Sequence, residues 1–257
     1  MTDIFSLAGK TALVVGASRG IGLAIAREVA RAGADTILAS RNLEALEKNA
    51  AALRGEGFLA RSLKMDVADP GSIQEAVAAA GHLDILHCVS GVNTRKRFET
   101  FERKDYDYIL GTNLIGIAEL TQEVGRKMIE RGQGGKIVMI GSLTTIIGVP
   151  YVAVYAMSKG GVGALARTLA VEWARHNIQV NCIAPGFILT DLNRKMWQDP
   201  VLLDWLPRVQ PNPNLGTPAD IAPLAVFLSG QGSNYITGQV ITVDGGFTSS
   251  ANWPFQP

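Results

Sequence analysis

Short apolar runs alternate along the chain with longer segments whose apolar residues recur at helical spacing. The runs rich in β-branched residues predict strands at 11–16, 36–40, 83–90, 136–142, 178–184 and 239–245, with a weaker one near 59–65. Because most of these runs are nearly continuous rather than alternating, they are typical of parallel strands covered on both faces. Amphipathic segments such as 25–33 and 43–57 lie between them. This alternation predicts an α/β fold, a doubly wound parallel sheet of about seven strands with helices on both faces.

One segment, 187–217, breaks this pattern. It is irregular, rich in Pro and Asn, and contains Trp197 and Trp205. A long irregular segment in a compact domain is usually functional, so we predict a substrate lid here, with a small helical pair packed on the surface as the alternative. The rest of the chain contains no internal repeat, linker or low-complexity stretch. Residues 1–257 are therefore predicted to form a single domain.

Composition adds little to this picture beyond exclusions. The chain has 257 residues, 47% of them hydrophobic and 18% charged, with a formal net charge of +1. This balance gives no electrostatic basis for binding nucleic acid or an anionic membrane. The uncharged stretches 137–158 and 221–243 are long enough to span a bilayer, but glycine and polar residues interrupt both. Two cysteines, Cys88 and Cys182, are too few for a disulfide framework, and no secretion signal opens the chain, which predicts a cytoplasmic protein.

The first predicted strand runs into a glycine-rich turn and then a helix. Gly16, Gly20 and Gly22 permit a tight turn, a close approach of the backbone to a ligand, and close packing of helix on strand. The amino terminus of the helix then offers free N–H groups and a positive dipole end to a phosphate. We interpret this turn as the phosphate cradle of a dinucleotide in a Rossmann-type sheet, although the spacing G-x-x-x-G-x-G differs from G-x-G-x-x-G.

The same residues allow a second interpretation. Residues 16–20 also fit the G-x-S-x-G elbow of a hydrolase, with Ser18 as the nucleophile. Such an enzyme needs a histidine at the carboxyl edge of the sheet. His176 and His82 instead precede strands, and His87 lies inside one. The hydrolase is therefore the weaker hypothesis.

The end of the second predicted strand indicates which nucleotide is bound. A carboxylate there would bind the ribose 2′-hydroxyl and disfavour a 2′-phosphate. The strand ends at Ser40 and Arg41, with no acid before Glu44. Arg41 and Arg19 could hold a 2′-phosphate by charge-assisted hydrogen bonds, which favours NADP(H) over NAD(H). The alternative is a pair of solvated surface arginines.

A tyrosine and a lysine stand four residues apart in an apolar segment. On a helix, Tyr155 and Lys159 would lie on one face, one turn apart. At ~4 Å and a dielectric constant of ~20, an ammonium favours a neighbouring phenolate by about 4 kcal/mol, so it would lower the pKa of the phenol. Ser142, at the end of a predicted strand, could hydrogen-bond a substrate oxygen. This set predicts general acid/base chemistry on a carbonyl or alcohol, with a capped surface turn as the alternative.

These motifs together resemble the short-chain dehydrogenase/reductase family along nearly the whole chain. The segment GASRGIG matches its cofactor turn, Tyr155 and Lys159 its Y-x-x-x-K motif, and Ser142 its serine thirteen residues before the tyrosine. Asn113 in GTNLIG matches its helix asparagine. The resemblance implies that Tyr155 is the acid/base, that Lys159 lowers its pKa and binds the ribose, that Ser142 positions the substrate, and that Asn113 holds a water in a proton relay.

The resemblance also implies a cofactor site drawn from several parts of the chain. Asp66 in KMDVAD matches an adenine contact, and Pro185–Gly186 followed by Thr190 matches the loop beside the nicotinamide. The full implied set is Gly16, Ser18, Arg19, Gly20, Ile21, Gly22, Ser40, Arg41, Asp66, Val67, Gly91, Tyr155, Lys159, Pro185, Gly186, Ile188 and Thr190. Where the family commonly has N-N-A-G, this chain has Cys88-Val89-Ser90-Gly91, and only the glycine is kept.

The function implied is an NADP(H)-dependent oxidoreductase that interconverts a ketone and a secondary alcohol, with a small-molecule carbonyl or alcohol substrate and no metal. An NAD(H)-dependent sugar-acid or polyol dehydrogenase and a non-catalytic nucleotide sensor are the alternatives. The stretch ARHNIQVN resembles gluconate 5-dehydrogenases, and 3-oxoacyl reductases are similar as well. Substrate choice is expected from the residues around Ser142 and Tyr155, from 93–97 and from the lid. Family members are usually homotetramers, built here through helices at roughly 102–131 and 151–175.

Overall fold

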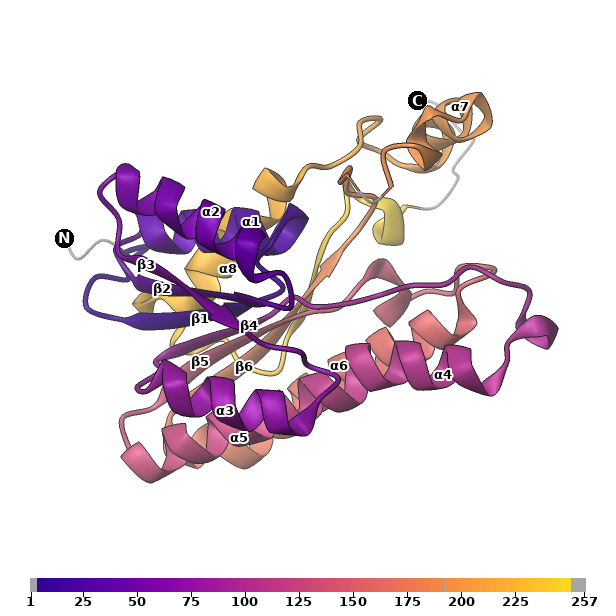
Figure 1. Ribbon diagram of the computed structural model, residues 1–257. Helices are drawn as coiled ribbons and strands as arrows, with labels where there is room; N and C mark the ends of the chain where they lie inside the picture. Colours follow the sequence, from indigo (N-terminus) through magenta and orange to yellow (C-terminus); the bar gives the residue numbers. More distant parts are fainter. Residues whose placement is uncertain (1–3, 192, 251–257) are drawn as a thin grey trace.

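The computed structural model describes residues 4–191 and 193–250. It contains one sheet of seven parallel strands in the order β3-β2-β1-β4-β5-β6-β7, with helices on both faces (Figure 1). The strands are β1 (Thr11–Val15), β2 (Asp35–Ser40), β3 (Ala60–Lys64), β4 (Ile85–Cys88), β5 (Gly135–Ile140), β6 (Ile178–Pro185) and β7 (Val240–Val243). The predicted doubly wound fold is confirmed, and each predicted strand has a counterpart.

The helices follow the strands as the periodicity predicts. They are α1 (Gly20–Arg31), α2 (Leu43–Gly55), α3 (Pro70–Ala80), α4 (Arg103–Leu110), α5 (Gly116–Arg131), α6 (Ala153–Trp173), α7 (Pro200–Val209) and α8 (Pro218–Ser229). Local chemistry starts several of them: the Asn42 side chain accepts from Ala45 N at 3.0 Å at the start of α2, and Asp69 caps α3. Such caps satisfy N–H groups that have no partner within the helix.

Two hydrophobic layers enclose the sheet. In Figure 1, α1, α2 and α8 cover one face, and α3, α5 and α6 cover the other. Successive side chains of a strand point to opposite faces. Leu13 and Val15 therefore join the layer under α3 and α5, whereas Ala12 and Val14 join the layer under α1 and α8. This double coverage explains why the strand sequences are continuously apolar.

Two strands end earlier than their patterns predict. The run 83–90 forms a strand only over β4, because the N–H groups of Val89 and Ser90 both turn to Val15 O, at 2.9 and 3.0 Å. The run 136–142 ends at Ile140. Ser142 therefore follows β5 and caps a short 3-10 helix, Leu143–Thr145. Both differences place a polar residue just beyond the carboxyl edge of the sheet.

A π-helical turn, Gly111–Ile115, joins α4 to α5. It lies inside the helical segment expected at roughly 102–131. Gly116 begins α5 immediately after it, and a Cβ at Gly116 would collide with Val67 O. Such π turns are frequent at functional sites. This one carries Asn113, which is fully buried.

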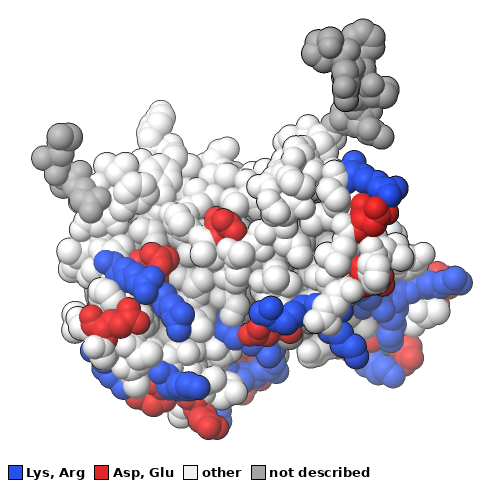
Figure 2. Space-filling view, turned by 90° about the horizontal axis from the view of Figure 1, so that it is seen from above, with Lys and Arg blue, Asp and Glu red and all other residues white. Residues whose placement is uncertain are grey.

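The charged side chains lie mostly at the margins of the face seen from above. In Figure 2, lysines and arginines are interspersed with aspartates and glutamates along one edge, and the remainder of the face is largely uncharged. Over residues 4–191 and 193–250, the helices are all too short or too polar to cross a bilayer. The uncharged stretches at 137–158 and 221–243 are instead strand, turn and helix.

Candidate active site

The glycine turn lies where the strand order reverses, between β1 and β4. Gly16 has a φ of +98°, and a Cβ there would lie 2.7 Å from Ser90 N. A Cβ on Gly22 would collide with the Gly16 carbonyl. Both positions therefore require glycine, one for its backbone conformation and both for space. Ligands in open α/β sheets bind at such a reversal, beyond the carboxyl ends of the strands.

The turn offers its backbone to an anion. Arg19 precedes α1 in an extended conformation, and no side chain caps the helix. The Asn49 side chain donates to Ser18 O at 3.0 Å and so ties α2 to the turn. Thr190, in the loop after β6, approaches Gly20. A Cβ added to Gly20 would lie 3.6 Å from Thr190 Cγ2. The glycine turn and the loop after β6 thus face one another, as a dinucleotide site requires.

The remaining predicted cofactor residues line the same edge of the sheet. Arg41 follows β2 and is exposed. Asp66 follows β3 and accepts from Ala68 N at 3.0 Å, while the neighbouring Val67 is buried. After β6, a Cβ on Gly186 would lie 2.6 Å from Asp244 Cα, so this glycine allows close packing against the β7 loop. The members not yet placed by a contact are Ile21 at the start of α1, Ser40 at the end of β2, Gly91 after β4, Pro185 at the end of β6 and Ile188, which bridges to Gly216.

Tyr155 and Lys159 lie on α6, one turn apart, as predicted. Lys159 Nζ is 5.8 Å from the centroid of the Tyr155 ring, and it donates to Ile140 O at 2.7 Å. Burial lowers the pKa of Lys159 to about 8. The ammonium is therefore anchored at the end of β5 and lies over the Tyr155 ring.

The expected lowering of the Tyr155 pKa is wrong for this structure. Burial raises the pKa of the phenol, and a hydrogen bond with Ser142 and the charge of Arg95 only partly oppose that rise. Burial is the largest cause, and Lys159, whose Nζ donates to Ile140 O, is not among the groups that lower this pKa. Tyr155 is therefore held as a protonated hydroxyl at neutral pH.

Ser142 connects the strand edge to the tyrosine. Its Oγ accepts from Thr144 N at 3.2 Å, so its hydroxyl proton remains for Tyr155 or a substrate oxygen. Thr145 Oγ1 accepts from Ser142 N at 3.1 Å and donates to Lys159 O at 3.1 Å. These bonds fix the Leu143–Thr145 turn against α6.

Asn113 fixes the segment that follows β4. Its Oδ1 accepts from Val92 N at 2.7 Å, and its Nδ2 donates to Val92 O at 2.8 Å and to Ser158 Oγ at 3.2 Å. Gly91 directly precedes Val92, and a Cβ added to Gly91 would lie 3.4 Å from Lys159 Nζ. Asn113 is thus a satisfied buried amide that holds the loop beside the lysine. Its predicted role in a water relay stays a prediction.

The sequence pointed to the segment 93–97 as a source of substrate choice but not to a particular residue. In the structure, Arg95 is the residue of this segment that acts on the site. Its charge acts on Tyr155, and its Nη1 contacts Met196 Sδ at 2.5 Å. Among the described ion pairs, its neighbour Lys96 pairs with Asp105 at 2.6 Å, whereas Arg95 has no carboxylate partner. A guanidinium in this setting is free to bind an anion.

The segment 187–217 contains more regular structure than its sequence suggests. It includes α7 and a 3-10 turn, Met196–Gln198, and Ile188 bridges to Gly216 at its base. Phe187 packs edge-on against Trp197, Trp205 and Phe247, with centroid distances of 5.4, 5.6 and 5.0 Å. Leu192 lies outside the described residues. A helical segment on an aromatic base thus stands beside Arg95.

The hydrolase alternative needs a histidine beside Ser18, and the structure places no described histidine there. His87 is buried with Ser229 Oγ at 3.1 Å, His82 lies 3.1 Å from Asp84, and His176 accepts from Arg175. Each described histidine is thus engaged away from Ser18. No cluster of three or more potential metal ligands occurs within the described ranges.

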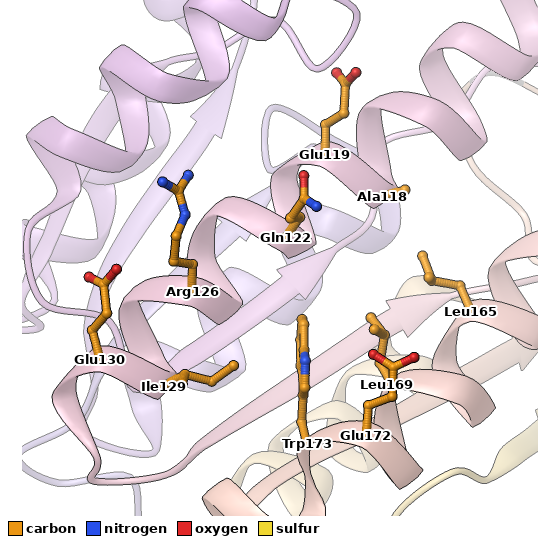
Figure 3. Close-up of a pocket in the computed structure, with 10 residues that line it drawn as sticks. All are labelled: Ala118, Glu119, Gln122, Arg126, Ile129, Glu130, Leu165, Leu169, Glu172 and Trp173. Atoms are coloured by element: carbon orange, nitrogen blue, oxygen red, sulfur yellow. The ribbon is translucent and has the colours of Figure 1, made fainter.

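An apolar groove lies away from this site, between α5 and α6 (Figure 3). Leu165, Leu169 and Trp173 of α6 line one side, and Ile129 of α5 lies opposite; the cavity volume is about 630 Å³. Trp173 packs so closely that a Cβ on Gly125 would collide with its ring. Charged residues such as Glu119 and Arg126 border the groove.

Comparisons with known proteins agree with this geometry. A family model described as enoyl-(acyl carrier protein) reductase matches residues 16–248. Gluconate 5-dehydrogenase of Gluconobacter oxydans (strain 621H) is 40% identical over 96% of this chain and 98% of its own length. 5-keto-D-gluconate 5-reductase of Escherichia coli (strain K12) is 34% identical over 96% of this chain and 98% of its own. A gluconate 5-dehydrogenase from Burkholderia cenocepacia J2315, solved with NADP and tartrate, superposes with a TM-score of 0.93 at 38% identity, over 97% of this chain and 99% of that one.

Proposed function

The chain belongs to the short-chain dehydrogenase/reductase family, whose members are oxidoreductases that act on CH–OH and C=O groups. We propose that it reduces a ketone to a secondary alcohol with NADPH and also catalyses the reverse reaction. The observation that carries the proposal is the meeting of Tyr155, Ser142 and Lys159 at the carboxyl edge of the sheet, beside the glycine turn. Relatives bearing NADP or acting on sugar acids support it.

The catalytic roles follow from the protonation and hydrogen bonding of these residues. In the reduction, the Tyr155 phenol donates its proton to the carbonyl oxygen, and its raised pKa keeps that proton in place at neutral pH. Ser142 accepts from Thr144 N and keeps its own hydroxyl proton, which it can donate to the same oxygen. Bound NADPH supplies the hydride. Lys159 keeps two ammonium hydrogens beyond its bond to Ile140 O, and these would bind the cofactor ribose.

The glycine turn and two exposed arginines fit NADP(H). The uncapped amino terminus of α1 suits a phosphate. Arg41 and Arg19 are exposed and take part in none of the ion pairs found among the described residues. We therefore assign the 2′-phosphate to these guanidinium groups. A structural relative with bound NADP supports this choice over NAD(H).

Replacing Arg41 by Ala is expected to raise KM for NADPH by about 10- to 100-fold and to leave KM for NADH nearly unchanged. A charge-assisted hydrogen bond is worth about 1.5–3 kcal/mol, and only the phosphorylated cofactor makes it. Steady-state kinetics with both nucleotides measure the effect, and Arg27→Ala, an exposed arginine farther along α1, is the control. Equal losses with NADPH and NADH would contradict the assignment.

A sugar acid is the substrate class that the site supports best. Arg95 brings a guanidinium that has no carboxylate partner among the described residues close enough to Tyr155 to act on its pKa, so a carboxylate bound there would lie near the reacting carbonyl. The relatives named for gluconate and 5-keto-D-gluconate support the same class. The segment 187–217, which contacts Arg95 through Met196, is our candidate for the lid.

The wild-type protein with NADPH should consume 5-keto-D-gluconate at least about tenfold more efficiently, in kcat/KM, than uncharged six-carbon ketoses. One charge-assisted contact to the carboxylate is sufficient for that ratio. Absorbance at the nicotinamide band measures the rates. A preference for uncharged ketones would exclude the sugar acid and leave the general ketone reductase, and no turnover of any carbonyl would overturn the proposed function.

A homotetramer remains our proposal for the assembly. The groove of Figure 3 exposes leucine and tryptophan side chains of α6 beside charged residues of α5, a surface suited to the same helices of a second copy. Sedimentation of the wild-type protein measures the assembled mass, and a monomer would contradict this assignment. A cytoplasmic location also stays a prediction.

A further inference from the structure

A methionine of the segment 187–217 lies against the arginine whose charge acts on Tyr155. Arg95 Nη1 donates to Met196 Sδ, across 101 residues of sequence. A thioether sulfur is a weak hydrogen-bond acceptor, so this contact holds the guanidinium only loosely. A stronger acceptor at the same place would hold Arg95 more firmly.

The main chain of Met196 is fixed independently of this contact. Met196 begins the 3-10 turn Met196–Gln198, and its carbonyl accepts from Asp199 N at 3.1 Å. Asp199 Oδ1 in turn accepts from Val201 N at 2.9 Å and so caps α7. A chemical change at the Met196 sulfur would therefore act through the side chain and leave the turn and α7 in place.

Met196 is also accessible from solvent. It is partly exposed, unlike Met65, Met128 and Met139, each of which is at most 1% exposed. Met157, on α6, is 51% exposed. Peroxides convert methionine to its sulfoxide, which is polar where the thioether is apolar. Among the described methionines, Met196 and Met157 are therefore the two that a peroxide can reach readily.

The two thiols compete poorly for the same oxidant. Cys88 and Cys182 are buried, and burial raises the pKa of Cys88 to about 12 and the pKa of Cys182 to about 11. The reactive form of a cysteine is the thiolate, and little of it forms at neutral pH when the pKa is this high. A peroxide is therefore expected to oxidise the exposed thioethers first.

We propose that Met196 is a modification site at which a peroxide regulates the use of the sugar acid. The O–O bond of hydrogen peroxide breaks, one oxygen atom is transferred to Met196 Sδ, and the other leaves as water, so that the thioether is oxidised and the peroxide reduced. The sulfoxide oxygen is a stronger acceptor than the thioether sulfur, and it holds the Arg95 guanidinium that would otherwise bind the substrate carboxylate. The inference rests on the proposed function and adds its regulation, because oxidised protein would consume NADPH more slowly at limiting substrate.

Kinetics before and after treatment with hydrogen peroxide test this inference. In the wild type, treatment should raise KM for 5-keto-D-gluconate about tenfold and leave kcat within about twofold, since one hydrogen bond to a charged group is worth about that factor. Met196→Leu, which has no sulfur at this position, should show the same KM before and after treatment. Met157→Leu is the matched control and should respond to peroxide as the wild type does.

A second measurement does not depend on turnover. Phenylglyoxal reacts with unbound guanidinium groups, and peptide mass spectrometry measures both its rate at each arginine and the oxidation of each methionine. Oxidation of Met196 should slow the modification of Arg95 about tenfold and leave the modification of the exposed Arg41 unchanged. In Met196→Leu, peroxide should not change the rate at Arg95.

The outcomes separate the inference from the function on which it rests. If Met196 stays a thioether in treated protein, or if Arg95 reacts equally fast after its oxidation, the inference is wrong and the proposed function is unaffected. An equal rise in KM in treated Met196→Leu also overturns it, because another residue would then be responsible. If the wild type turns over no carbonyl but oxidation still protects Arg95, the proposed function and its regulation are wrong, and the modification site with its contact to Arg95 is confirmed.

Discussion

Replacing Tyr155 by Phe is expected to lower kcat by about 10³-fold while NADPH still binds. In the proposed reaction the carbonyl oxygen receives the phenol proton, and general acid catalysis contributes roughly 10²- to 10⁴-fold. The phenylalanine ring retains the buried packing of Tyr155, so the fold should be preserved. Turnover of 5-keto-D-gluconate at the nicotinamide band measures kcat, and a thermal shift with NADPH measures binding.

The control for this change is Tyr108→Phe, at a half-exposed tyrosine of α4. It should leave kcat within about twofold, since a solvated hydroxyl outside the site contributes little. A Tyr155→Phe enzyme as fast as wild type would disprove the acid/base role. If wild type binds NADPH but turns over no carbonyl, the non-catalytic nucleotide sensor becomes the better hypothesis.

Replacing Gly22 by Ala should abolish NADPH binding over the range in which wild type is saturated and should lower the free energy of unfolding by about 1–3 kcal/mol. The added methyl group would collide with the Gly16 carbonyl, which is backbone and cannot rotate away. Gly16 is itself confined by its φ of +98° and by Ser90 N at 2.7 Å from its would-be Cβ. Overpacking of this kind usually costs about 1–3 kcal/mol, and here it would distort the turn that we propose for the cofactor phosphates. Urea unfolding and a nucleotide titration give the two quantities.

Gly55→Ala provides the matched control for Gly22. Gly55 also lies in a helix, but a Cβ there meets nothing within 4 Å. Alanine should therefore leave NADPH binding unchanged and raise the free energy of unfolding by up to about 1 kcal/mol. Wild-type NADPH affinity in the Gly22→Ala protein would show that the phosphates bind elsewhere.

Much of the site could be predicted because its key spacings are local. Tyr155 and Lys159 lie on one helical face whatever surrounds them, and Gly16, Gly20 and Gly22 lie within one turn. The roles of single atoms were not predictable in the same way. The direction of the Tyr155 pKa depends on burial and on Lys159 Nζ bonding to Ile140 O, nineteen residues away. The sequence spacing alone favoured the opposite direction.

Contacts between residues far apart in the sequence could also not be predicted from the pattern of hydrophobic and polar residues. Arg95 meets Met196 across 101 residues, and Asn113 holds Val92 across 21. The segment 187–217 looked irregular because Pro and Asn dominate parts of it, yet it contains α7 on an aromatic base. Tertiary packing outweighs weak local propensity in such segments.

By itself, the sequence determined the layered α/β fold and the family, and it singled out the glycine turn and the Tyr155–Lys159 pair that we propose as phosphate cradle and acid/base pair. Each of these follows from short-range periodicity or from residues that lie close together along the chain. The tertiary structure decided where the strands end, which groups hold Asn113 and Lys159, and that Arg95 contacts Met196 of the segment 187–217. These features depend on how segments far apart in the chain approach one another, and burial and distance, which no local pattern records, set their energies.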